Sequence, residues 1–178
     1  MGLAYENLDE ETRRFMVEEI EMDIASDKIY RSSYLTQTGQ GNWPEYLLDA
    51  ARTGSDETLS RTLQMAGSFN AMPTRQLANG KVIQAKVPHN AADVLAESEF
   101  NRYYCRGLSR RALEAGLPRL EVYRAKQVAV PRPESEEKIG LLCEPEVLLI
   151  DLRKSQGVEP ALGIPPGPGS GISVRIPR

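Results

Sequence analysis

The sequence has one histidine and two cysteines among its 178 residues. Metal sites and most nucleophilic catalytic sites are built from these residue types. His89 stands alone, and Cys105 and Cys143 are far apart in the chain, so neither a metal-ligand set nor a catalytic triad can be assembled. We therefore predict a non-enzymatic protein with no catalytic residue, no metal site, no cofactor and two free cysteines in a reducing compartment.

Long apolar runs are also absent, because no stretch reaches the roughly 18 apolar residues that a membrane-spanning helix needs. Residues 1–11 are polar and acidic, unlike a signal peptide. The pair of glycines at Gly39 and Gly41 is too short a motif for a phosphate-binding loop. These features predict no membrane partner, no small-molecule ligand and a cytoplasmic location.

Charge is distributed unevenly along the chain. Residues 1–60 hold 13 acidic and 5 basic side chains, whereas residues 61–133 hold 12 basic and 5 acidic ones. Such asymmetry favours contact between copies of the chain or with nucleic acid. Neutralisation of the two regions inside one fold is an equally open interpretation.

The centre of the chain, residues 79–130, predicts a strand, a long helix and a second strand. The turn signal Asn79-Gly80 precedes a β-branched segment at 81–87. Residues 91–115 contain no helix breaker except Gly107, and residues 119–130 again have strand character. Parallel pairing of the two strands would make the helix a right-handed crossover, and antiparallel pairing remains open.

The other segments complete an α+β fold class. Apolar spacing and capping residues predict helices at 9–25, 42–51, 56–66 and 145–154. We expect a helical N-terminal part (1–78), the central β-α-β unit (79–130) and a C-terminal helix, together forming one domain over residues 1–154.

Residues 155–178 form an extended Gly/Pro-rich C-terminal arm in this interpretation. Ile172, Val174 and Ile176 alternate with other residues near its end, which is typical of a short strand. A strand on a flexible tether is suited to adding to the edge of a sheet, so we predict that these three residues dock on a neighbouring protein.

A basic cluster lies in and after the long helix. It comprises Arg102, Arg106, Arg110, Arg111, Arg119, Arg124, Lys126 and Arg132, with Tyr103, Tyr104 and Tyr123 between them. Arginines beside aromatic rings suit phosphate contact and base stacking, and equally suit an acidic protein surface. Ion pairs within the fold are the third interpretation. From this cluster, Arg102, Arg106, Arg110, Arg111, Arg124, Lys126 and Tyr103 are the predicted partner or nucleic-acid contacts.

Three motifs resemble segments of small uncharacterised proteins of tailed bacteriophages and prophages. They are Glu99-Phe-Asn-Arg-Tyr-Tyr, Leu120-Glu-Val-Tyr-Arg-Ala-Lys and Pro131-Arg-Pro-Glu-Ser. These motifs have no assigned chemistry, so the resemblance transfers no residue role. It implies a phage setting, with the protein in the bacterial host or in the virion as a head or head-tail component.

The expected function is therefore that of a structural protein that assembles with a protein partner or with copies of itself through its C-terminal arm. The alternative is a nucleic-acid-binding protein that acts through the region Arg102–Arg132.

Overall fold

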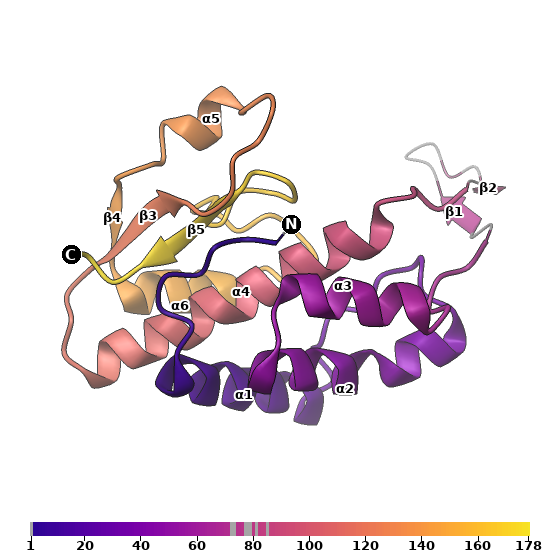
Figure 1. The fold of residues 1–178 in the computed structure, drawn as a ribbon, viewed down its shortest axis with the longest axis horizontal. Coiled ribbons are helices and arrows are strands. Elements are labelled where there is room, and N and C mark those ends of the chain that lie inside the picture. The colour runs from indigo at the N-terminus through magenta and orange to yellow at the C-terminus, as the bar shows by residue number, and fades with distance from the viewer. Residues whose placement is uncertain (1, 72–73, 77–79, 81, 85) are drawn as a thin grey trace.

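A computed structural model describes residues 2–71, 74–76, 80, 82–84 and 86–178, and its fold class is α+β as predicted (Figure 1). The helices of this described part are α1 (Glu10–Ala25), α2 (Gln37–Thr53), α3 (Asp56–Met65), α4 (Ala91–Glu114), α5 (Pro133–Glu136) and α6 (Pro145–Lys154). The strands are β1 (Thr74–Gln76), β2 (Val82–Gln84), β3 (Leu120–Arg124), β4 (Leu142–Cys143) and β5 (Ile172–Arg175).

Helix α4 is the centre of the molecule. It has 24 residues, 16 of them buried, because α1, α3, α6 and β5 all pack against it. Figure 1 shows it running between the helical layer and the three-stranded sheet. Gly107 lies where α1 crosses, and a Cβ atom there would come within 2.7 Å of Met16 Cγ and 3.0 Å of the Thr12 carbonyl oxygen. The close approach of these two helices therefore requires glycine.

The predicted helices α1, α3, α4 and α6 are confirmed. The Asp9 side chain accepts a hydrogen bond from the Thr12 amide at the start of α1. Ser55 and Thr58 form a reciprocal capping box at the start of α3. These local bonds satisfy amide groups that the first helical turn leaves unpaired, which explains why sequence reasoning located both helix starts.

The predicted start of the second helix at residues 42–44, with Pro44 in its first turn, was wrong. Helix α2 begins at Gln37, with Thr36 as its cap, and contains Pro44 in its interior. Tertiary contacts outweigh the poor helix propensity of this segment. Gly39 packs directly against the backbone of Ser68, and the fully buried Trp43 donates a 2.8 Å hydrogen bond to the Tyr30 carbonyl.

The strand, long helix and strand predicted at the centre are present as β2, α4 and β3, but within the described residues β2 and β3 pair with each other neither in parallel nor antiparallel. Strand β2 pairs antiparallel with β1, and β3 pairs antiparallel with β4 on one side and β5 on the other. A nearby hairpin partner closes a short loop at low entropic cost, and both edges of β3 are already occupied. Asn79 of the predicted turn lies outside the described residues.

The strand predicted in the C-terminal arm is confirmed, but it belongs to the chain's own sheet. Val174 lies opposite Val122 of β3, and Ile172 and Val174 are fully buried while Ile176 is partly buried. The Asn101 side chain donates a 2.9 Å hydrogen bond to the Ile172 carbonyl. In this structure, the residues predicted to dock on a neighbour are therefore part of the chain's own core, which corrects the expectation of a free docking strand.

This burial predicts a loss of stability when a buried side chain of β5 is shortened. Ile172→Ala should lower the free energy of unfolding by about 2–5 kcal/mol, because the cavity lies between β3 and α4. Val158→Ala, in the same arm but 62% exposed, should change it by less than about 0.5 kcal/mol. Urea unfolding followed by circular dichroism measures both. Equal effects of the two substitutions would contradict the packing described here.

Candidate functional site

Arg106, a member of the predicted basic cluster, is fully buried rather than exposed to a partner. Its Nε atom donates a 2.9 Å hydrogen bond to Glu19 Oε2, and its two terminal nitrogens reach Asp23 at 2.5 and 3.1 Å. The Tyr103 hydroxyl donates to the same Asp23 carboxylate at 2.8 Å. Arg106 and Tyr103 of α4 thus connect to the acidic face of α1 by charge-assisted hydrogen bonds.

Glu19 joins a third helix to this cluster, because Arg153 of α6 donates to it at 2.9 and 2.5 Å. Burial disfavours the Glu19 carboxylate, but the hydrogen bonds from Arg153 and Arg106 and their charges outweigh it and lower its pKa. Burial and the neighbouring Asp23 charge raise the pKa of Tyr103. Glu19 therefore stays ionised and Tyr103 stays protonated at neutral pH, which suits a structural contact.

The other predicted contact residues also have partners in their own chain. Arg102 donates to the carbonyls of Ser155 at 2.7 Å and Val158 at 3.1 Å. The remaining contacts are Arg110 with Glu18 at 2.7 Å, Arg111 with Asp9 at 2.6 Å, Lys126 with Glu97 at 2.8 Å, and Arg124 with Glu136. Across the α1–α4 contact, three of these basic residues thus pair with acidic residues of the first third of the chain: Arg106, Arg110 and Arg111.

Replacement of Arg106 tests this buried cluster. Arg106→Met should destabilise the protein by about 3–5 kcal/mol, because Glu19 and Asp23 would lose their buried cationic partner. Arg110→Met, one helical turn later and 32% exposed in its side chain, should cost less than about 1 kcal/mol. Chemical unfolding near pH 7 separates the two cases, and similar losses would contradict the assignment of Arg106 as the buried anchor.

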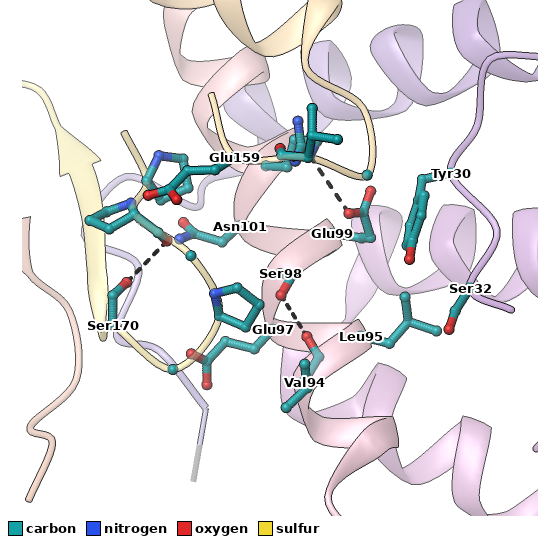
Figure 2. A pocket seen from close by; sticks show the side chains of 18 of the residues that line it. Tyr30, Ser32, Val94, Leu95, Glu97, Ser98, Glu99, Asn101, Glu159 and Ser170 are labelled. Carbon is teal, nitrogen blue, oxygen red and sulfur yellow. Dashed lines mark hydrogen bonds and ion pairs between the residues drawn. The ribbon is translucent and has the colours of Figure 1, made fainter. Parts of the chain in front are cut away.

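A pocket of about 410 Å³ lies between the first half of α4 and the Gly/Pro segment 157–170 (Figure 2). Its third wall is the segment from Tyr30 to Tyr34. The ring of Tyr30 packs on Gly157, where a Cβ atom would lie 2.4 Å from Tyr30 Cδ2. Gly157 also has a positive φ of 69°, so both backbone conformation and space require glycine there.

Glu99 stands in this pocket, and Figure 2 shows its carboxylate beside the Tyr30 ring. The residue is only 4% exposed. Arg102 Nε lies 3.6 Å from its carboxylate, which is longer than a normal hydrogen bond, and this Nε has no hydrogen-bond partner among the described residues. Burial raises the pKa of Glu99 despite the opposing Arg102 charge. A buried carboxylate with a raised pKa in a cavity is typical of a binding site.

Glu99 and Arg102 lie at i, i+3 on α4 and form an ion pair. The sequence did not predict the pocket, because two of the three walls come from segments about 70 residues before Glu99 and 60 residues after it. The polar and Gly/Pro-rich composition of those walls carries no signal of where they fold back.

The two cysteines are free, as predicted. Burial raises the pKa of the Cys105 thiol to about 12 and that of Cys143 to about 11, so both are protonated and poorly nucleophilic at neutral pH. Within the described ranges, no three His, Cys, Asp or Glu side chains are close enough together to hold a metal ion. None of the helices in that part of the chain is long and apolar enough to cross a membrane.

The raised pKa of Glu99 has a consequence for stability. The native state retains the Glu99 proton to higher pH than the unfolded chain, in which this carboxyl has its ordinary pKa of 4.5. The stability of the wild-type protein relative to Glu99→Gln should therefore fall as pH rises from 4.5 through the raised pKa, and be constant below 4.5.

Parallel urea titrations of the two proteins between pH 4 and 8 measure this difference. A difference that grows in favour of the wild type with rising pH would show that the native environment favours the charged carboxylate, contrary to its burial.

Comparisons with known proteins identify no relative. No protein-family model matches the sequence, no curated protein matches it, and no solved structure matches the fold.

Proposed function

We propose that this chain is a non-enzymatic structural protein that assembles with copies of itself through the outer surface of β4 and α6. The observation that carries the proposal is a concentration of exposed apolar side chains. Eleven large apolar side chains are exposed among the described residues, and five of them fall between positions 139 and 150: Ile139, Leu141, Leu142, Val147 and Ile150. Exposed apolar side chains gathered in one place mark interaction surfaces.

Three of these side chains are exposed on β4 and on α6, the element that follows it in the chain. Leu142 belongs to β4, an edge strand of the sheet, and is 59% exposed. Val147 and Ile150 follow on α6, one turn apart on the face opposite the buried Leu148 and Leu152. Helix α6 is therefore apolar on two faces, and its own fold covers one of them.

The charges on α6 favour a second copy as the partner. Glu146 lies near the N-terminal end of the exposed face and Lys154 at its C-terminal end, and both are exposed. Antiparallel packing of two such helices about a two-fold axis would place each Glu146 near Lys154 of the second copy. The apolar residues Val147 and Ile150 would then meet between these charge pairs.

A tailed-phage particle is the setting we propose for this assembly. What supports it is the resemblance of the motifs beginning at Glu99, Leu120 and Pro131. The first motif contributes Asn101 and Arg102, which hold the C-terminal segment by hydrogen bonds to Ile172, Ser155 and Val158.

Nucleic-acid binding through Arg102–Arg132 stays an untested alternative with less support from geometry, because the predicted contact residues have partners within the chain. It predicts DNA or RNA binding that weakens steeply as salt is raised, with one unit of slope lost per phosphate-contacting arginine removed. Absent or salt-insensitive binding would exclude it.

The assembly proposal predicts concentration-dependent association of the purified chain. The double variant Leu142→Asp/Ile150→Asp should weaken self-association at least about tenfold, because it places two charges in the apolar contact. Met65→Asp is the matched control, since Met65 is 88% exposed but lies on α3, away from β4 and α6. Sedimentation velocity over a range of concentrations measures the effect.

A wild-type chain that sediments as a monomer at every concentration would overturn the proposal. Equal weakening by the Met65 control would mean that added charge, rather than this surface, governs association.

A further inference from the structure

The pocket beside α4 is lined by more negatively than positively charged side chains. Four prolines of its Gly/Pro wall, which have no backbone N–H group to donate, are Pro160, Pro165, Pro166 and Pro168. Three carboxylates, Glu97, Glu99 and Glu159, line the pocket against two guanidinium groups, Arg102 and Arg132. This lining favours a ligand that is positively charged and donates hydrogen bonds.

Terminal nitrogens of both guanidinium groups already contact backbone carbonyls, whereas Arg102 Nε has no hydrogen-bond partner among the described residues. Arg102 donates to Ser155 and Val158, and Arg132 reaches Pro168 at 3.5 Å. Glu97 is paired with Lys126 and in Figure 2 points to the side opposite Tyr30. Glu99 is left as the buried carboxylate whose nearest cation, at 3.6 Å, is beyond hydrogen-bond distance.

The walls around Glu99 suit an apolar body attached to a cation. Leu95 lines the pocket one helical turn before Glu99 on the same side of α4, Val94 lines it next to Leu95, and the Tyr30 ring flanks the carboxylate (Figure 2). An aromatic face next to a carboxylate attracts an ammonium group through both the ring quadrupole and the negative charge. The volume of about 410 Å³ is that of a small-molecule pocket.

We propose that this pocket binds an alkylammonium group, with the ammonium donating to Glu99 and the alkyl chain lying against Val94 and Leu95. The ligand is a free amine or the lysine side chain of another protein, since both present the same chemistry. The inference rests on Glu99 and its surroundings, and it is independent of the assembly surface on β4 and α6.

Titration of the full chain with hexylamine tests the proposal, with binding followed by isothermal calorimetry and by two-dimensional NMR. Hexan-1-ol is the matched probe, because it has the same alkyl chain without the charge. Hexylamine should bind at least about tenfold more tightly than the alcohol, the ratio expected for a charge-assisted hydrogen bond. The NMR shifts should centre on residues 94–99 and on Tyr30.

Two variants assign the binding to Glu99. Glu99→Gln keeps the size of the side chain and should weaken hexylamine binding roughly 10- to 100-fold. Glu97→Gln removes an equal charge two residues away and should change binding less than about threefold, because that carboxylate is paired with Lys126. The far-UV circular dichroism of each variant verifies folding, and Glu99→Asp, which keeps the charge, provides a second readout if Glu99→Gln does not fold.

Nα-acetyl-lysine N-methylamide distinguishes the two sources. Tighter binding of this capped lysine than of hexylamine identifies a protein side chain as the ligand, and the reverse order identifies a free amine. Equal binding of hexylamine and hexan-1-ol, no binding of either at millimolar concentration, or equal losses in the Glu97 and Glu99 variants would each overturn the proposal. None of these outcomes depends on whether the chain self-associates.

Discussion

The contact of Arg106 with Glu19 and Asp23 fixes how the helices of this protein lie on one another. Its three side chains come from α1 and α4, and Arg153 adds α6 through Glu19. A buried ion cluster of this kind adds modest net stability, because desolvation offsets most of the attraction. Its effect is on geometry, since any rotation or shift of α1 along α4 would leave a buried charge without its partner. Gly107 also fixes the position of α1 along α4, because the two helices can approach this closely only where α1 passes over the glycine.

The C-terminal segment is the second constraint, and it links the core to both candidate surfaces. Asn101 and Arg102 bind its backbone, β5 completes the sheet beside β3, and the Gly/Pro stretch between them forms a wall of the Glu99 pocket. The same face of α4 therefore holds the chain together and shapes the pocket. Asn101 both contacts β5 and lines the pocket, and Arg102 lines the pocket and binds the backbone at Ser155 and Val158, so hydrogen bonds from α4 hold this Gly/Pro-rich segment on a defined path.

The sequence predicted the features that depend on neighbouring residues. Asp9 and Ser55 mark helix starts by bonds to amides three residues later, and the alternation of Ile172 and Val174 marks a strand. It did not predict features set by distant partners. Strand β3 pairs with β4 and β5 rather than with the strand before α4, and Pro44 lies inside a helix because Trp43 and Gly39 are held by packing. The basic cluster was visible as a pattern, but the acidic partners of its buried member, Arg106, are more than 80 residues earlier in the chain. Neither the hydrophobic pattern nor the helix and strand propensities of the sequence predicted the pocket.

The position of β5 has a consequence for how this protein folds. Strand β3 lies in the middle of its sheet, yet its longer partner is separated from it by about 50 residues, and Arg175 pairs with Glu6 across 169 positions. Contacts between such distant segments form late, because the loop between them must close first. Until then, β3 exposes an unpaired edge with Leu120 and Val122, which is the kind of edge on which partly folded chains aggregate. The interval before the C-terminal segment returns is therefore the stage at which this chain is most exposed to misfolding and most in need of a chaperone.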